Sequence, residues 1–353
     1  MPEAAPKKLQ VSLIGCGEIA PDNATGIRAS KECELGPVMD LDEKVARNLG
    51  SRFGVPGTNS LQRVLEDPAV DAVVVAVPHY LHAEICAQAA GAGKHVIVEK
   101  PLATTLADAD RMIEDCDAAG VTLSVLFSFR YEPSVVRARA LVDAGAIGDV
   151  VGTSLQFMTE KPASYWAEGY KGRVRSDWRG SWEKAGGGVL LMNTCHMLDY
   201  FRHITGLEVV RAYGELNTLN SPVEVEDIVS ATLRYEGGQI GSVLSASLAR
   251  GERWRSDERI WGTHGSLVLA PDPAIYSMRK VAGLKPARWQ SLKKLPPSSR
   301  VATYFDRLAL ALRNGEAPDV TGHDGKVNLA LILAIYQASR EGRAIDVDAG
   351  SSA

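Results

Sequence analysis

The chain has 353 residues, of which 45% are hydrophobic and 23% are charged, and its formal net charge is −4. This length exceeds what one compact core usually serves and fits two domains. The composition is ordinary for a globular protein, and the slightly acidic balance excludes the strongly basic surface typical of nucleic-acid binding. We therefore expect no nucleic-acid partner. No apolar run approaches the roughly 20 residues of a membrane helix, so we expect no membrane partner either.

The five cysteines are scattered along the chain without a paired or zinc-type spacing: Cys16, Cys33, Cys86, Cys116 and Cys195. They indicate buried, reduced thiols. The N-terminal segment, residues 1–10, lacks the apolar stretch of a signal peptide and predicts a short flexible tail. We therefore expect a cytoplasmic protein. No cluster of His, Asp or Glu has ligand spacing, so no metal site is expected.

Strand and helix patterns alternate through the first third of the chain. Apolar runs predict strands at 9–17, 34–40, 70–78, 95–101 and 121–129. Helical patterns lie between them, ending at about Lys31 and covering 42–53, 81–94 and 105–120. Pro37 is awkward inside the second strand, because proline donates no ladder hydrogen bond. The alternation predicts a doubly wound parallel sheet, a Rossmann-type domain, over residues 1–127.

The pattern changes after about residue 150. Long strand-like runs follow at 150–160, 209–219, 227–250 and 258–270. The glycines of segment 234–241 indicate a hairpin turn. A last helix is predicted at 326–342 and can pack back on the first domain. Residues 128–353 therefore predict a second, α+β domain with an open, mainly antiparallel sheet, within an α/β fold class overall.

The motif GCGEIA, which begins at Gly15, directly follows the first strand and opens the first helix. Gly15 makes the tight turn, Gly17 admits a pyrophosphate close to the backbone, and Ala20 lets helix and strand pack closely. Asp40, at the end of the second strand, can accept hydrogen bonds from ribose hydroxyls and would repel a 2′-phosphate. Leu41 beside it offers no cation, so the pattern favours NAD over NADP. The alternative is a tight turn and an unrelated surface aspartate.

The segment VIVEKPLA places Glu99 and Lys100 at the carboxyl end of a buried strand. In an open α/β sheet, ligands bind at that edge. Partial desolvation lowers the pKa of a lysine toward a value useful for proton transfer, and its ammonium group can bind a substrate hydroxyl. The alternative is a surface lysine paired with Glu99.

Seven segments occur in the order GCGEIA, VPHYLHAEI, EKPLA, FSFRYEP, AGGGVLLMNTCHMLD, WGTHGSL and VTGHDG. In this combination the chain resembles the Gfo/Idh/MocA oxidoreductases, the family of glucose–fructose oxidoreductase and inositol dehydrogenase, from about Gln10 to about Asp346. The resemblance implies hydride transfer between NAD and a secondary hydroxyl of a sugar, glycoside or cyclitol. It also implies that the open sheet of the second domain mediates a homodimer or homotetramer.

The resemblance further implies roles for single residues. Lys100 matches the lysine that contacts cofactor and substrate and helps move the hydroxyl proton, and His196 matches the catalytic histidine. Pro78, His79 and His82 match the segment beside the nicotinamide, although His79 replaces a frequent asparagine and His82 could instead be a surface residue at a helix start. The expected cofactor contacts are Gly15, Gly17, Glu18, Ile19, Ala20, Asp40, Leu41, Pro78, His79, His82, Glu99 and Lys100.

Aromatic and basic side chains concentrate in segment 165–188, where they suit stacking on sugar rings and binding of hydroxyls or carboxylates. A long loop covering the second sheet is the alternative. Arg130 matches a residue near the site entrance of the family, with a structural ion pair as its alternative. The basic residues that leave room for an anionic substituent are Lys171, Arg173, Arg175 and Arg179. The expected substrate contacts are Arg130, Tyr165, Trp178, Arg179 and Asn193.

Three glycines, Gly186–Gly188, precede a predicted helix at 189–205 that contains His196. In an α-helix, residues 192, 196 and 199 share one face. The family often has Asp, sometimes Asn, at the position of Met192. A carboxylate there would raise the pKa of the imidazole and fix its tautomer, and Met192 can do neither. Without a carboxylate partner, the pKa of His196 is expected near ~6.5 or lower with burial, which makes it a positioner or proton acceptor beside Lys100. Asn193 lies within reach, and a core histidine is the alternative.

Two other functions stay open beside simple dehydrogenation. One is NAD-dependent glycoside cleavage by transient oxidation and elimination. The other is a non-catalytic protein that binds nucleotide or sugar as a sensor. The presence of both Lys100 and His196 favours an enzyme, whereas Met192 argues mildly for a sensor.

Overall fold

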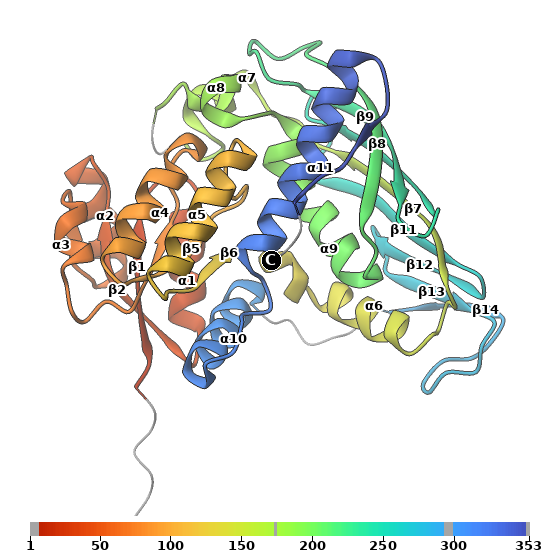
Figure 1. Cartoon of the computed structure of the whole chain (residues 1–353), viewed down its shortest axis with the longest axis horizontal. Coiled ribbons are helices and arrows are strands. Elements are labelled where there is room, and N and C mark those ends of the chain that lie inside the picture. The colour runs from red at the N-terminus through yellow and green to blue at the C-terminus, as the bar shows by residue number, and fades with distance from the viewer. Residues whose placement is uncertain (1–6, 173–174, 293–298, 351–353) are drawn as a thin grey trace, which may run out of the picture. The chain divides into compact units, whose positions relative to one another are not determined.

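A computed structural model describes residues 7–172, 175–292 and 299–350 of the chain (Figure 1). They form two compact units, each assembled from three segments. The first unit takes Met1–Ser128, Glu168–Arg175 and Ser298–Lys326, and the second takes Phe129–Ala167, Ser176–Pro297 and Val327–Ala353. Of the predicted N-terminal tail, residues 1–6 lie outside the described residues.

The first unit is built on a parallel sheet (Figure 1). Its described strands are β1 (Leu9–Ile14), β2 (Cys33–Met39), β3 (Gly57–Thr58), β4 (Ala72–Val75), β5 (His95–Val98) and β6 (Leu123–Val125). Their order is β3-β2-β1-β4-β5-β6. The direction of winding reverses between β1 and β4, and such a switch point is where open α/β sheets bind ligands. The predicted doubly wound sheet is confirmed.

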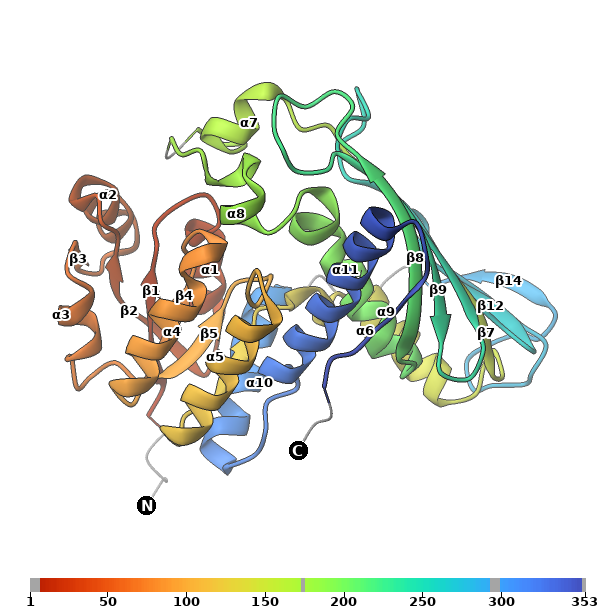
Figure 2. The same ribbon diagram turned by 45° about the horizontal axis from the view of Figure 1, so that its top comes forward.

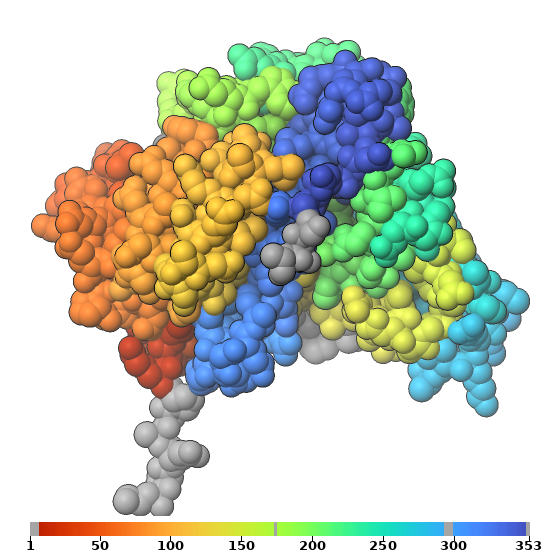
Figure 3. Space-filling model, in the orientation of Figure 1, coloured from red at the N-terminus to blue at the C-terminus, as the bar shows by residue number. Residues whose placement is uncertain are grey.

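The helices of the first unit cover this sheet. They are α1 (Ala20–Ala29), α2 (Glu43–Phe53), α3 (Leu61–Leu65), α4 (His82–Gly91), α5 (Leu106–Ala118) and α10 (Arg300–Asn314). α4 and α5 pack side by side, and their side chains form a continuous surface in the space-filling view (Figure 3). α10, which the sequence analysis did not predict, packs on α1. Gly26 permits this close approach, because a Cβ there would lie 2.2 Å from Val301 Cγ1.

Pro37 remains inside β2, which lies between β3 and β1. The pairing register shifts at this point, since Val11 faces Leu35 whereas Leu13 faces Val38. A bulge of this kind tolerates a residue that cannot donate to the ladder. The local irregularity thus accommodates the proline without ending the strand.

A mixed sheet forms the second unit. Its described strands are β7 (Val150–Met158), β8 (Val209–Asn217), β9 (Ile228–Tyr235), β10 (Ile240–Ala246), β11 (Arg255–Gly262), β12 (Gly265–Ala270), β13 (Ala274–Ser277), β14 (Arg288–Ser291) and β15 (Ile345–Asp346). Their order is β14-β13-β12-β11-β7-β10-β9-β8-β15. Only β7 and β10 pair in parallel among the named strands of this sheet, so the predicted mainly antiparallel sheet is confirmed.

The helices of the second unit are α6 (Pro133–Asp143), α7 (Ala163–Glu168), α8 (Trp182–Ala185), α9 (Cys195–Thr205) and the part of α11 (Gly322–Glu341) that begins at Val327. In Figure 2, α6, α9 and α11 lie along one face of the sheet, and the opposite face carries no described helix. The core lies under these helices: Leu155 and Phe157 of β7 are buried there, whereas Gln156 between them is exposed.

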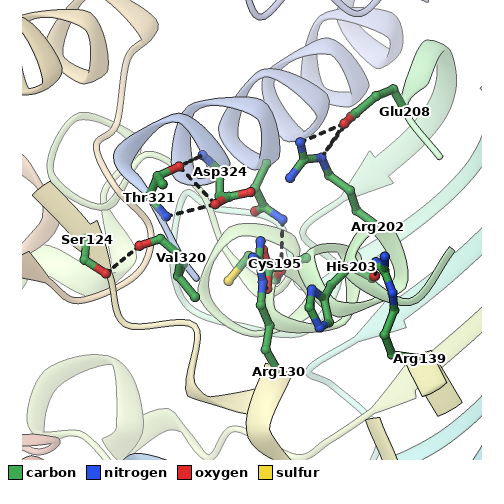
Figure 4. A network of polar contacts seen from close by, with 12 residues as sticks. Ser124, Arg130, Arg139, Cys195, Arg202, His203, Glu208, Val320, Thr321 and Asp324 are labelled. Carbon is green, nitrogen blue, oxygen red and sulfur yellow. Dashed lines mark hydrogen bonds and ion pairs between the residues drawn. The ribbon is translucent and has the colours of Figure 1, made fainter. Parts of the chain in front are cut away.

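The last helix begins earlier than predicted, at Gly322. Thr321 and Asp324 exchange hydrogen bonds at this start: Thr321 N donates to Asp324 Oδ2 over 2.8 Å, and Asp324 N donates to Thr321 Oγ1 over 3.2 Å (Figure 4). Reciprocal bonds of this kind form a capping box. Across the three described ranges, none of the helices has the length and apolarity that crossing a membrane requires.

Candidate functional site

The turn after β1 has the shape that a dinucleotide loop needs. Gly15 has a φ of +95°, and a Cβ there would lie 2.4 Å from the carbonyl oxygen of Ala76, so only glycine fits. At Gly17, by contrast, an added Cβ would meet no atom within 4 Å. No side chain caps the first turn of α1, so a bound phosphate can take that place. The described residues therefore fit a dinucleotide pyrophosphate.

Asp40 joins the glycine loop to the end of β2. Its Oδ2 accepts a hydrogen bond from Cys16 N over 2.8 Å, and its Oδ1 accepts one from Asp42 N over 3.0 Å. These two donors fix the carboxylate where a dinucleotide fold presents an acidic side chain to the ribose. Leu41 beside it is 82% exposed and brings no positive charge.

Glu99 and Lys100 follow β5 at the same sheet edge as the glycine loop. Asn23 of α1 donates from Nδ2 to Glu99 Oε1 over 2.8 Å, and Glu99 N donates to Val75 O over 2.9 Å. These bonds connect the helix after the glycine loop with the ends of β4 and β5. Burial raises the pKa of Glu99, and the Lys100 ammonium group opposes that shift. Asn23 was missed by the sequence analysis, because its role depends on this tertiary contact.

His82 is fully buried, so its alternative as a surface residue is wrong. Its Nδ1 lies 3.0 Å from Pro101 O and 3.2 Å from Leu102 O, and its Nε2 lies 3.1 Å from Val77 O. Burial lowers the pKa of this imidazole. The ring thus supports the loops after β4 and β5. Its contact with the cofactor stays a prediction, as does that of His79, whose ring centroid lies 5.7 Å away.

The basic end of segment 165–188 meets acidic residues around the glycine loop. Within the first unit, Lys171 N donates to Glu18 Oε2 over 2.8 Å, and Lys171 Nζ lies 3.3 Å from Asp22 Oδ2. Arg175 pairs with Glu168 over 3.1 Å. Arg173 lies outside the described residues. Lys171 and Arg175 thus have protein carboxylates beside them, where the sequence alone leaves room for an anionic substituent of a substrate.

Each of the three glycines in Gly186–Gly188 is required by a different feature of the structure. Gly186 ends α8 with a φ of +79°. A Cβ at Gly187 would lie 2.1 Å from the hydroxyl oxygen of Tyr336, and one at Gly188 would lie 1.9 Å from Glu226 O. The chain therefore passes directly against Glu226 and Tyr336 before the next helix begins.

Glu226 anchors the start of that helix. Its Oε2 accepts a hydrogen bond from Gly188 N over 2.6 Å, and its Oε1 accepts one from Leu190 N and one from the Tyr336 hydroxyl, each over 2.9 Å. Burial raises the pKa of this carboxyl group to about 7. Glu226 is not predictable from the sequence, because no local pattern separates it from the acidic residues beside it.

The sequence predicted an α-helix over 189–205, but the segment that carries His196 is not α-helical throughout. Leu190–Thr194 forms a π-helical turn, and α9 begins at Cys195. Thr194 Oγ1 donates to Val189 O over 3.2 Å within this turn. A π-helical turn adds a residue to the helical repeat, so the expected α-helical alignment of Met192 with His196 is wrong. His196 and Asp199 both lie in α9 and keep their predicted i, i+3 spacing.

Met192 faces Lys161 and Tyr165, with its Sδ 3.7 Å from Lys161 Nζ and 3.8 Å from the Tyr165 hydroxyl. Lys161 Nζ also lies 4.7 Å from the Tyr165 ring centre. Arg179 stacks nearby, with its Cζ 5.7 Å from the Tyr165 ring and 4.8 Å from the Trp178 ring. The structure thus brings Tyr165, Trp178 and Arg179 together around Met192. Lys161 was missed, because it precedes the aromatic segment.

His196 and Asn193 are both nearly buried, with 8% and 7% of their surfaces exposed. The imidazole ring lies 4.5 Å from the Phe129 ring, centre to centre. Asn193 Oδ1 is buried and has no hydrogen-bond partner among the described residues. An unsatisfied buried acceptor costs about 1–3 kcal/mol, so a ligand hydroxyl that donates to Asn193 would recover that energy.

Arg130 forms the ion pair considered as its alternative. Its Nε and Nη2 donate to Asp199 Oδ2 and Oδ1 over 2.8 and 2.6 Å, and both side chains are buried. A substrate contact by Arg130 stays a prediction. Further bonds hold α9: Arg139 donates to His203 O, Arg202 to Glu208, and Asn328 to Cys195 O (Figure 4).

The predicted site residues divide between the two units. The expected cofactor contacts and Lys100 belong to the first unit, whereas His196 and all the expected substrate contacts belong to the second. The approach of Lys100 to His196 therefore stays a prediction. Within the described ranges, no three His, Cys, Asp or Glu side chains gather in a way that could hold a metal ion.

Comparisons with known proteins extend over most of the chain. Residues 9–127 match a family described as "Oxidoreductase family, NAD-binding Rossmann fold", and residues 135–268 match the GFO/IDH/MocA C-terminal domain. The chain is 27% identical to a D-apiose dehydrogenase of Paraburkholderia graminis, over 97% of this chain and 90% of the relative. It is 26% identical to a scyllo-inositol 2-dehydrogenase (NAD(+)) of Bacillus subtilis, over 97% of each chain.

A solved structure of levoglucosan dehydrogenase, in complex with NADH and levoglucosan, is similar in fold. Its TM-score is 0.85 at 24% sequence identity, covering 97% of this chain and 100% of that one. The two-part architecture described above is therefore also that of a known dehydrogenase.

Proposed function

The chain belongs to the Gfo/Idh/MocA family of oxidoreductases, and on that premise we propose that it oxidises a secondary hydroxyl of a sugar, glycoside or cyclitol with NAD. The relatives named for D-apiose and scyllo-inositol support this substrate class. NAD, when bound, supplies the acceptor for the hydride from the carbinol carbon.

The Asn23–Glu99 hydrogen bond carries the proposal. It joins the helix behind the glycine loop to the residue next to Lys100, over 2.8 Å. An ammonium group is thereby held at the edge of the sheet that presents the glycine loop. As an ammonium group, a lysine at this edge can donate a hydrogen bond to the substrate hydroxyl. As a neutral amine, it can accept the proton of that hydroxyl.

The second unit offers groups that suit a polyol. We assign His196 to holding or moving the hydroxyl proton and Asn193 Oδ1 to accepting a hydrogen bond from a substrate hydroxyl. The unsatisfied state of Asn193 Oδ1 among the described residues supports its assignment. The aromatic and guanidinium groups around Met192 suit the apolar faces and hydroxyls of a sugar.

Preference for NAD over NADP follows from Asp40. Two backbone donors fix its carboxylate, and Leu41 next to it is exposed without bringing a positive charge. A 2′-phosphate placed there would be repelled.

We also propose that a second copy of this chain covers the bare face of the second sheet. Four exposed apolar side chains lie on that face, because the residues next to them or next to their cross-strand partners are buried on the other side: Tyr213, Ile240, Trp261 and Trp289. Exposed apolar surface of this kind marks association sites. The five cysteines are buried thiols, which supports a reducing, cytoplasmic location.

A turnover assay tests the proposal. The full-length protein is incubated with NAD and a panel containing pentoses, hexoses, glycosides, anhydrosugars and inositols, and NADH absorbance is followed. We expect NADH with at least one class and a weaker response when NADP replaces NAD. Release of an aglycone from a glycoside without net NADH would instead indicate cleavage by transient oxidation. Tight NADH binding without turnover of any panel member would contradict the proposal.

A further inference from the structure

Trp254 combines a strained backbone with an exposed ring. Its φ is +54°, a value that is rare for a residue with a bulky side chain. Its side chain is nevertheless 43% exposed. Strain of this kind persists where the surrounding structure enforces it, and such positions concentrate at binding sites.

The Trp254 ring ends a row of aromatic rings that starts at His196. The centre of the Phe129 ring lies 4.5 Å from that of the His196 ring. The Trp254 ring stacks on the same Phe129 ring, with 6.1 Å between the ring centres and 23° between the ring planes. Phe157 meets Trp254 edge-on, at 4.8 Å and 74°. These contacts fix the orientation of the indole ring although much of it stays exposed.

The side of the sheet on which Trp254 lies argues against a second copy as its partner. Phe157 is fully buried in β7, between the exposed Gln156 and the half-buried Met158. It therefore belongs to the buried face of the sheet, and the Trp254 ring packs against it there. Figure 2 shows that α9 covers one face of this sheet. The bare face proposed for a second copy is the opposite one.

We propose that Trp254 is a binding platform for the ring of a sugar or cyclitol, whose apolar C–H face stacks on the indole. This inference rests on the proposed function, because it assumes a cyclic polyol near His196. A flat indole face buries the C–H groups of such a ring and leaves the ring-edge hydroxyls free to form hydrogen bonds. Since the indole is held before the ligand arrives, little side-chain entropy is lost on binding.

Three variants of Trp254 separate the ring from the strain. Trp254→Phe keeps an aromatic face, Trp254→Ala removes it, and Trp254→Gly removes it together with the backbone strain. Ala287→Gly is the matched control, because Ala287 also has a positive φ, of 57°, but lies in a different loop. KM and kcat are measured with the panel substrate that turns over fastest, and thermal unfolding is recorded for each variant.

We expect KM to rise about tenfold or more in Trp254→Ala and Trp254→Gly, with kcat changed less than about threefold. Trp254→Phe should stay within about threefold of the wild type. Trp254→Gly should unfold at a higher temperature than Trp254→Ala, because glycine adopts this φ freely. Ala287→Gly should leave KM unchanged.

A KM within twofold of the wild type in Trp254→Ala, with turnover present, would overturn the platform while leaving the proposed function intact. A reduced molecular mass with unchanged KM would show that Trp254 binds another copy. If no substrate turns over, the platform is tested by binding instead: D-glucose, D-xylose and myo-inositol are titrated into the NADH-loaded protein in a calorimeter. Weaker binding by Trp254→Ala than by the wild type supports the platform, and equal or absent binding refutes it.

Discussion

At the scale of single residues, Glu226 explains why the helix of His196 starts where it does. A buried carboxyl group receives two backbone N–H groups and the Tyr336 hydroxyl, all in one unit. Its negative charge lies at the N-terminal end of a helix, where such a charge is favourable. Burial nevertheless raises its pKa to about 7, so the Glu226 carboxyl group takes up a proton as pH falls through neutrality.

Stability should therefore depend on pH through Glu226. In the unfolded chain the carboxyl group loses its proton near pH 4.5, whereas in the folded chain it does so near pH 7. The folded state binds more protons between these values, so this group makes the free energy of unfolding fall as pH rises through that window. The loss is about 3 kcal/mol. Glu226→Gln should remove this slope, as measured by urea unfolding at several pH values.

Glu236→Gln is the control, because Glu236 is exposed. It should keep the wild-type slope. If wild type and Glu226→Gln show parallel stability curves from about pH 4.5 to about pH 7, the assigned burial and protonation of Glu226 are wrong.

Lys100 should be needed for turnover more than for cofactor binding. Lys100→Ala removes the ammonium group at the sheet edge, and the loss of a general acid–base residue lowers kcat by about 10²–10⁴-fold. NADH affinity, measured by fluorescence titration, should change less than about tenfold, because the glycine loop is untouched. Lys31→Ala, at an exposed position, should behave as the wild type. Undiminished kcat in Lys100→Ala would remove Lys100 from the proposed chemistry.

The sequence could predict residues whose role follows from a local motif. Gly15, Asp40 and Lys100 each stand at a strand end, and the order of strands decides where strand ends meet. Glu226 and Trp254 could not be predicted in this way, since their roles depend on contacts between segments distant in the sequence. The pairing of Arg130 with Asp199 required the same knowledge.

At the scale of elements, the glycine-rich entry to the His196 helix is a packing requirement. Gly188→Ala would place a Cβ 1.9 Å from Glu226 O, an overlap that backbone atoms must move to relieve. We expect a loss of about 1–3 kcal/mol of unfolding free energy, because the Glu226 anchor is displaced. Urea unfolding measures it directly.

Gly17→Ala is the matched comparison. A Cβ there meets no atom within 4 Å, so the fold should tolerate it. The added methyl group would stand where the pyrophosphate approaches the backbone, and NADH binding should weaken. Equal unfolding of Gly188→Ala and the wild type would contradict the packing account, and unchanged NADH affinity in Gly17→Ala would contradict the loop assignment.

Most elements of the first unit could be predicted because continuous apolar runs mark buried parallel strands. The π-helical turn at Leu190–Thr194 could not, because the same residues also fit the pattern of an α-helix. The parallel pairing of β7 with β10 was equally hidden, since neighbouring hairpins favour antiparallel pairs. The β-bulge at Pro37 is a feature of the pairing of β2 with β1, which the local sequence pattern does not show.

At the scale of the whole molecule, association through the bare sheet face is the proposal to test. Ile240 and Trp261 both face Gly152 from the strands on either side of β7, so they form one exposed patch. Ile240→Lys combined with Trp261→Lys should convert the oligomer into a monomer, because two charges would be buried in the interface. Light scattering coupled to size-exclusion chromatography measures the mass.

Leu310→Lys is the control, since Leu310 is similarly exposed on α10 of the first unit. Its mass should equal that of the wild type. A monomeric wild type, or an unchanged mass in the double variant, would contradict an interface on this face.

Transfer of a labelled hydride is the decisive test of the proposed oxidation by NAD. The substrate found in the panel is prepared with deuterium on its carbinol carbon, and the protein converts it with NAD. We expect the deuterium to appear in NADH and the substrate to become the corresponding carbonyl compound, both seen by mass spectrometry. Substrate conversion with no deuterium in NADH, or with the label returned to the product, would contradict the proposed dehydrogenase.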